Sequence, residues 1–275
     1  MSMMGELKFF LRLQFHQSPC VIFISQSQYA IEPLMKHGMD ECISMSTPMA
    51  TKRLDANLQG TLTDQMNYLR MIGGLVYLIA SRPDIAFATF VCVCYQARPM
   101  VKHLKEVKQI LQYLRQSYNM GLWYPKDSEF KLIAYSDVDH AGCKDDFQTE
   151  AECVSLSACC VQIIRMQTQL LEYRYKYNKI LMYYDSKSAI AISCNRVQYS
   201  HTKHIDIRYH LIKEHVEKGM VELYFVGTEY QLADLFTKAL PKERLEYLVH
   251  RIVKMEILLE PTSNKLLVGD LRDSI

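Results

Sequence analysis

Four acidic residues lie where an apolar segment ends or a helical pattern begins, and carboxylates at such places can bind metal ions. Asp137 follows an alternating segment in AYSDVDHAG, and Asp185 follows an apolar segment in MYYDSKSAI. Glu152 and Asp234 lie in two segments with helical periodicity, TEAECVSLS and YQLADLFTK. Ligands of α/β sheets bind beyond the carboxyl ends of the strands, so side chains at these places can converge.

Converging carboxylates repel one another unless a cation lies between them. Hard divalent cations such as Mg²⁺ take oxygen ligands and keep positions open for phosphate oxygens. Two such ions about 4 Å apart can activate water and stabilise the leaving oxygen of a phosphodiester. The pattern therefore indicates a site for two Mg²⁺ ions formed by Asp137, Glu152, Asp185 and Asp234. Ordinary surface acids at the ends of elements are the alternative interpretation.

The second half of the chain alternates between strand and helix patterns, which predicts a partly parallel sheet covered by helices. We expect strands at 131–137, 180–184 and 221–226, and helices at 150–173 and 205–218. Thr228 with Gln231 three residues later has the pattern of a capping box, so a further helix is expected to begin at Thr228.

The first half of the chain has mostly helical patterns, with one β-branched strand segment at Val21–Ser25. We expect a helix at 28–37, two helical segments within 64–96 that are interrupted at Arg82-Pro83, and an amphipathic helix at 101–116. The predicted fold class is therefore α/β, or α+β overall. The boundary between the two regions is expected at about residue 127.

The composition excludes several classes of protein. A hydrophobic fraction of 49% and a charged fraction of 23% are globular values, and the net charge of +2 means that any basic surface must be local. The apolar runs are too short to span a membrane, so an intracellular protein without a membrane partner is expected. Nine cysteines without a CxxC motif indicate buried thiols in a reducing compartment rather than a disulfide framework.

Basic residues gather in two places and could contact a phosphate backbone. One group lies along the expected helix 101–116, and the other lies near a histidine-rich segment. A solvated helix face is the alternative for the first group. A zinc site at His201 and His204 lacks the further ligands that structural zinc requires. The predicted nucleic-acid-binding residues are Lys102, Lys105, Lys108, Arg115, Lys203 and Arg208.

Several motifs, in order along the chain, carry a resemblance to a known family. They are LKFFLRLQFHQS, MIGGLVYLIASRPDIAFAT, YSDVDHAGC, EAECVSLSA, YYDSKSAIAIS, TKHIDIRYHLIKEHVEKG and YFVGTEYQLADLFTKAL. With them the chain resembles the C-terminal part of the Pol polyprotein of copia-type long-terminal-repeat retrotransposons.

The resemblance implies that residues 1–127 are a remnant of the C-terminal part of a reverse transcriptase, similar to its thumb and connection regions. It implies an RNase H-like domain with a mixed sheet at 128–255, followed by a tail at 256–275. It also implies that Asp137, Glu152, Asp185 and Asp234 hold Mg²⁺ and cleave the RNA strand of RNA/DNA hybrids, with Glu150 as the alternative to Glu152. The expected partners are such hybrids and other Pol segments.

Two departures from the family weaken the expected activity. The paired aspartates of a polymerase hairpin are absent, so no DNA polymerisation is expected. The connection 144–149 is also too short for the hairpin that precedes the glutamate helix, which needs about a dozen residues. We therefore expect an internally deleted RNase H-like domain that lacks two strands. Three hypotheses follow: an impaired nuclease, a non-catalytic nucleic-acid-binding remnant, and a decayed open reading frame.

Overall fold

The computed structural model describes residues 6–51, 60–126, 132–137, 145–175, 179–187, 190–191 and 203–255; for 145–154, 203–209 and 253–255 the description covers the backbone. The chain divides into two compact units, 1–128 with 238–275, and 129–237. The domain limits predicted from the sequence differ from this division at 238–255. The described residues of that segment group with the first unit because strand β8 (Val253–Met255) pairs with β4 (Met120–Pro125).

The first unit contains an antiparallel sheet where the sequence indicated a single strand. That strand, β3, has the predicted limits Val21–Ser25. It pairs with β4, and a Cβ added at Gly121 of β4 would collide with the Ile24 carbonyl oxygen, so this position requires glycine. The strands, in their order across the sheet, are β1 (Phe9–Phe10), β2 (Leu13–Gln17), β3, β4 and β8.

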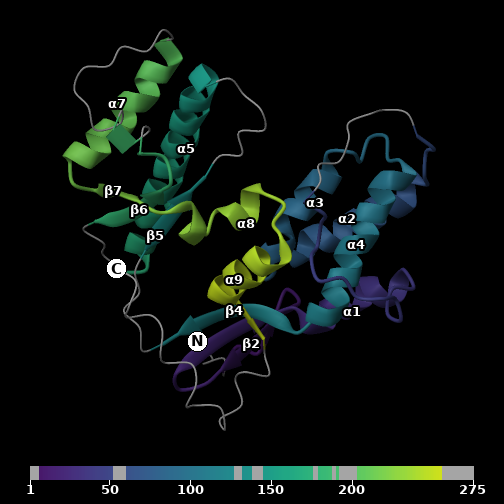
Figure 1. Ribbon diagram of the computed structural model, residues 1–275. Coiled ribbons are helices and arrows are strands. Elements are labelled where there is room, and N and C mark those ends of the chain that lie inside the picture. The colour runs from purple at the N-terminus through teal and green to yellow at the C-terminus, as the bar shows by residue number, and fades with distance from the viewer. Residues whose placement is uncertain are drawn as a thin grey trace. The chain divides into compact units, whose positions relative to one another are not determined.

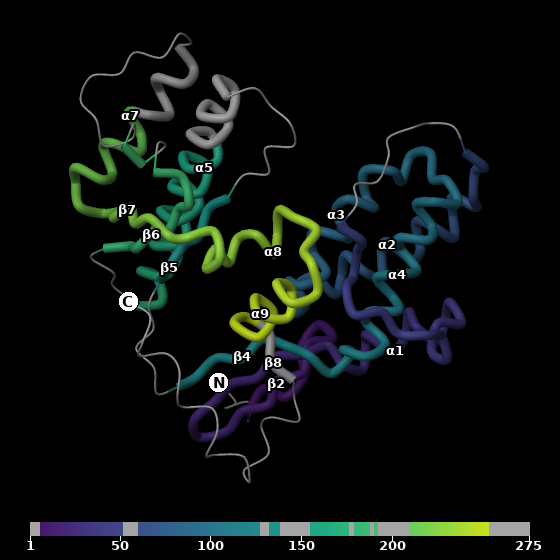
Figure 2. The backbone as a smooth tube through the Cα atoms, in the orientation of Figure 1, coloured from purple at the N-terminus to yellow at the C-terminus, as the bar shows by residue number. Residues whose placement is uncertain are grey.

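The helices of the first unit follow the predicted pattern, including the interruption at Arg82-Pro83. Asp64 caps one of them, because its carboxylate accepts hydrogen bonds from the amides of Met66 and Asn67. Figure 2 shows α2, α3 and α4 clustered together, and these three helices contact one another. The helices are α1 (Ser27–Lys36), α2 (Gln65–Leu78), the 3₁₀ turn η1 (Pro83–Ile85), α3 (Ala86–Val93), α4 (Val101–Ser117) and α9 (Lys242–Ile252).

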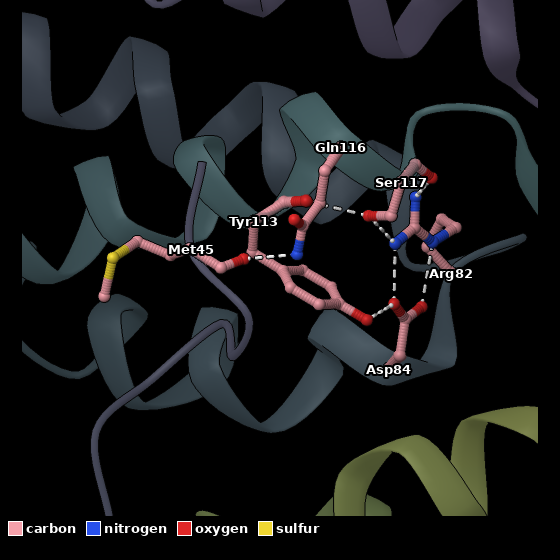
Figure 3. A network of polar contacts seen from close by, with 6 residues as sticks. All are labelled: Met45, Arg82, Asp84, Tyr113, Gln116 and Ser117. Atoms are coloured by element: carbon pink, nitrogen blue, oxygen red, sulfur yellow. Dashed lines mark hydrogen bonds and ion pairs between the residues drawn. The ribbon is translucent and has the colours of Figure 1, made fainter. Parts of the chain in front are cut away.

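Hydrogen bonds from a buried ion pair at η1, between Arg82 and Asp84, join this turn to α4 (Figure 3). Arg82, 1% exposed, donates to Asp84 through Nε at 2.9 Å and through Nη2 at 2.6 Å. The Tyr113 hydroxyl donates to Asp84 Oδ2 at 2.8 Å, and Arg82 Nη2 donates to Ser117 Oγ at 2.8 Å. Burial raises the pKa of the Tyr113 phenol well above its usual value and the Asp84 carboxylate adds to this effect, so the hydroxyl remains a donor.

The second unit is built on a parallel sheet in the order β5-β6-β7. Helices α5 and α7 pack against each other and cover one face of it (Figure 1). The other face carries Tyr135, Tyr183 and Tyr224 in register, with ring centroids 5.2 and 5.7 Å apart. The elements are β5 (Ile133–Ser136), α5 (Asp145–Glu172), β6 (Ile180–Tyr184), α7 (Lys203–Glu217), β7 (Val221–Phe225), the 3₁₀ turn η2 (Thr228–Tyr230) and α8 (Asp234–Thr237).

The core of the second unit lies between this sheet and the two helices. Leu156 and Cys160 of α5 and Ile212 of α7 are fully buried against Met182 and Tyr184 of β6. Burial raises the pKa of the Cys160 thiol to about 11, so this cysteine behaves as a small apolar side chain. With a helix-covered parallel sheet in one unit and helices beside an antiparallel sheet in the other, the predicted α/β (α+β) fold class is confirmed.

The described residues of the second unit contain three strands, and all of them are parallel. The segment 144–149, interpreted as a short connection, is largely helical because α5 begins at Asp145. Between β5 and α5, Asp137 alone belongs to the described residues. The expected loss of a hairpin stays a prediction.

Three helices end in the same C-terminal motif, but with different residues at its left-handed position. In α1 and α7 this position is Gly38 and Gly219, at φ of 62° and 67°. In α5 it is Arg174, at φ of 66°. The Arg174 amide donates to the Leu171 carbonyl and the Tyr175 amide to the Leu170 carbonyl, which completes a Schellman motif. A non-glycine residue is strained in this conformation.

We expect Asp84→Ala to lower the free energy of unfolding of the first unit by about 3–5 kcal/mol, because the Arg82 charge would remain buried without its partner. Tyr113→Phe, the matched control, removes one hydrogen bond and should cost about 1–2 kcal/mol. Urea unfolding followed by the fluorescence of Trp123, the single tryptophan of the sequence and a residue of β4, measures both. Equal losses for the two variants would contradict the role assigned to the ion pair.

We expect Arg174→Gly to stabilise the second unit by about 1 kcal/mol, because glycine adopts the left-handed conformation without strain. Gly219→Ala places a Cβ in the same motif of α7 and should destabilise by a similar amount, about 1 kcal/mol. Thermal unfolding followed by far-ultraviolet circular dichroism compares the two. A lower melting temperature for Arg174→Gly would show that the arginine side chain stabilises the fold more than its backbone strain costs.

Candidate functional site

The carboxyl ends of β5 and β6 place two of the predicted acids side by side. Ser136 and Tyr184 are the last residues of β5 and β6, and they are paired in the parallel ladder. Asp137 and Asp185 directly follow them. Neighbouring strands lie about 4.8 Å apart, and the two backbones therefore leave the sheet at the same level. This end of the sheet, with Asp137, Asp185 and the segment that carries Asp234, is called the acidic edge below.

Helix α8 is fastened to the acidic edge by two side chains. The Thr237 hydroxyl donates to Asp137 Oδ2 at 2.5 Å. Gln231, with 0% exposure, donates through Nε2 to the Ser136 carbonyl at 2.9 Å, and its Oε1 accepts from the Ala233 amide at 3.3 Å. Asp234 lies between these two attachments and is 3% exposed. The segment 231–237 is therefore anchored where β5 ends.

Helix α5 reaches the same edge through Ser155. Its hydroxyl donates to the Asp137 carbonyl at 3.3 Å and lies 3.1 Å from the Ser136 hydroxyl. Glu152 precedes Ser155 by three residues, which is about one turn of α5. The side chain of Glu152 lies outside the described residues.

The donor chemistry at the acidic edge suits Mg²⁺, which prefers carboxylate oxygens and often uses only one or two of them together with water. Among the described side chains, no group of three His, Cys, Asp or Glu residues comes close enough to hold a metal ion. The described acids are of the type that Mg²⁺ prefers, but three of them do not lie close enough together to bind one ion. The assignment of Asp137, Glu152, Asp185 and Asp234 stays a prediction.

The basic residues predicted in α4 have different environments. Lys105 and Lys108 are exposed, and Lys102 is half-buried. Arg115 donates a hydrogen bond to the Cys42 carbonyl and therefore holds the segment that follows α1. This contact gives Arg115 a structural role that the periodicity of the helix did not indicate.

Gln116, next to Arg115 in α4, also holds the segment that follows α1. It donates to the Met45 carbonyl at 2.6 Å, next to the Arg82 network (Figure 3).

The side chains of Lys203, His204 and Arg208 lie outside the described residues, as does His201. Nucleic-acid binding by the two basic groups stays a prediction.

The predicted capping box at Thr228 and Gln231 is wrong. Residues Thr228–Tyr230 form a short 3₁₀ turn that follows Gly227, without a side-chain cap. Gln231 instead donates to the Ser136 carbonyl, because that buried acceptor at the end of β5 needs a donor. The sequence analysis also missed Thr237 and Ser155, since no local pattern shows that their hydroxyls meet Asp137.

Comparison with known proteins shows that the chain is similar to Pol polyproteins of retroelements. The retrovirus-related Pol polyprotein from transposon RE1 of Arabidopsis thaliana is 30% identical over 277 residues, covering 90% of this chain and 19% of that protein. The Pol polyprotein from transposon TNT 1-94 of Nicotiana tabacum is 28% identical over 82% of this chain and 20% of that protein. An uncharacterized mitochondrial protein of Arabidopsis thaliana is 31% identical over 51% of this chain and 58% of that protein.

The chain belongs to the family of copia-type Pol polyproteins of transposons, and it spans about a fifth of the length of the curated relatives that it matches. The alignment with the RE1 protein extends over 277 residues but takes in only 90% of this 275-residue chain, so the relative has residues without a counterpart here. No family model and no solved structure matches the chain.

We expect Gln231→Leu to destabilise the second unit by about 1–3 kcal/mol, because the Ser136 carbonyl would stay buried without its donor. Glu229→Gln, an exposed change two residues away, should stay within about 0.5 kcal/mol of the parent chain. Urea unfolding followed by circular dichroism measures both variants. A neutral Gln231→Leu variant would contradict the role of this side chain as the anchor between α8 and β5.

Proposed function

We propose that the second unit is an RNase H-like nuclease that hydrolyses the RNA strand of RNA/DNA hybrids with Mg²⁺ at the acidic edge. One observation carries the proposal: Asp137 and Asp185 follow paired residues of adjacent parallel strands, and the segment that carries Asp234 is bonded to the same strand end. Membership of a family of Pol polyproteins supports a substrate that contains nucleic acid.

The protein's own residues orient the carboxylates in this proposal. Thr237 donates to one carboxylate oxygen of Asp137, and Ser155 holds the main-chain carbonyl of the same residue. Gln231 keeps α8, and with it Asp234, at the end of β5. Mg²⁺ bound by the four predicted acids would supply the activation of water and the stabilisation of the leaving oxygen.

A second candidate is a nucleic-acid-binding remnant without turnover. Two observations favour it: the described sheet has three strands, and the described carboxylates do not form a closed set of three ligands. Exposed lysines such as Lys105 and Lys108 would then contribute binding that weakens as the salt concentration rises, because the release of counterions from the nucleic acid becomes less favourable. Binding and cleavage of the same hybrid therefore have to be measured separately.

We expect the chain to cleave a labelled RNA/DNA hybrid in Mg²⁺, and Asp185→Asn to lower the rate by about 100-fold or more because a ligand charge is lost. Glu217→Gln, which changes an exposed carboxylate at the end of α7, is the matched control and should cleave at the parent rate. Circular dichroism shows whether each variant is folded.

The assay separates the two candidates. Cleavage that depends on Mg²⁺ and is lost in Asp185→Asn supports the nuclease. Salt-dependent binding of the hybrid without cleavage above the Asp185→Asn variant would replace it with the binding remnant. Neither binding nor cleavage by the folded chain would contradict both candidates and leave the hypothesis of a decayed open reading frame.

A further inference from the structure

A cluster of exposed aromatic and basic residues lies where α5 ends and β6 begins. Tyr173 is 75% exposed and Tyr175 is 52% exposed, and Arg174 between them is also exposed. Lys179 precedes β6 and forms a surface ion pair with Glu222 at 2.6 Å. Such exposed pairs contribute little to stability, so Lys179 can exchange its partner for a phosphate. These four residues, Tyr173, Arg174, Tyr175 and Lys179, are called the amino-edge cluster.

The backbone at Arg174 is an independent sign that this cluster has a role beyond folding. The same C-terminal motif in α1 and α7 uses glycine, at Gly38 and Gly219, and only in α5 among these three helices does a charged residue adopt the strained conformation. Strained conformations of this kind cluster at active sites and ligand clamps, and among the described residues Leu11 and Arg12, between β1 and β2, also have positive φ. The strain at Arg174 is therefore accounted for if its guanidinium binds a ligand.

The amino-edge cluster is separate from the acidic edge. Lys179 precedes the first residue of β6, and Asp185 follows its last residue. Five residues of a parallel strand extend over roughly 17 Å, so the two sites lie at opposite ends of the sheet. A ligand at the amino-edge cluster is thus additional to the hybrid proposed at the carboxylates.

We propose that the amino-edge cluster binds single-stranded nucleic acid, with bases stacked on Tyr173 and Tyr175 and phosphates held by Arg174 and Lys179. Exposed aromatic rings beside cations are the two components of sites for unpaired strands, because every base has a face that can stack and every nucleotide carries a negative charge. A duplex would not bind in this way, since its bases are already stacked on one another. Unpaired DNA and unpaired RNA share this chemistry.

Fluorescence anisotropy of the full chain with labelled oligonucleotides tests the proposal. EDTA is present throughout, so that cleavage cannot contribute and the result does not depend on the proposed nuclease. The probes are a single-stranded DNA, the RNA of the same sequence and the duplex of the DNA with its complement. We expect both single strands to bind more tightly than the duplex, and Tyr173→Ala and Tyr175→Ala each to weaken them by about 5- to 100-fold.

Arg174→Gly provides the sharpest variant because its two expected effects have opposite signs. The melting temperature should rise, since the strain is removed, while the affinity for single strands should fall. The slope of log affinity against log salt should also become shallower by about 0.7, the value for one phosphate contact on a single strand. Loss of binding in a more stable protein cannot come from damage to the fold.

A control variant locates the binding. Tyr230→Ala removes an exposed tyrosine in η2, beyond the other end of the sheet. It should bind single strands like the parent chain. Parent-like affinity in Tyr173→Ala and Tyr175→Ala, an equal loss in Tyr230→Ala, or preference for the duplex would each overturn the proposal. Binding of DNA alone or RNA alone would support it and identify the source of the strand.

Discussion

Parallel pairing of Ser136 with Tyr184 is the constraint on which the second unit depends. In this register Met182 and Tyr184 point into the core and meet Leu156 and Cys160 of α5. A shift of one residue would turn the buried side chains of β6 to the tyrosine face. It would also move Asp185 away from the level of Asp137. The apolar core and the placement of the two acids therefore follow from one register, and selection for either preserves the other.

Helix α5 connects the two ends of this sheet. Ser155 contacts the Asp137 carbonyl at the carboxyl end, and Tyr173 lies at the helix terminus that leads back to the start of β6. The eighteen residue steps from Ser155 to Tyr173 span about 27 Å at 1.5 Å per residue, which is more than the length of the strands. Because both α5 and α7 lie on one face, the opposite face is left to the tyrosine ladder. The unit is thus a layered structure with chemically different edges.

Elements with a strong local pattern could be predicted from the sequence. The β-branched run Val21–Ser25 and the apolar run Ile180–Tyr184 have the predicted limits, and the apolar stripe predicted the amphipathic helix α4, which contacts α2 and α3. The antiparallel sheet of the first unit could not be predicted in this way. Strand β4 pairs with β3 although most of the sequence of the first unit lies between them, as the pairing of Val21 with Pro125 shows. Such non-local pairing leaves no periodic signal in either segment.

The acidic edge also has one part that could be predicted from the sequence and another that could not. The positions of Asp137 and Asp185 follow from the ends of predicted strands, whereas their supporting side chains depend on contacts between distant segments. Gln231 illustrates the reason: locally it completes a capping box with Thr228, and in the fold it meets a buried carbonyl ninety-five residues away. A helix cap at an exposed end can be replaced by water, but the Ser136 carbonyl has no such substitute. The Ser136 carbonyl, and not the backbone amide of Thr228, is therefore the partner of the Gln231 side chain.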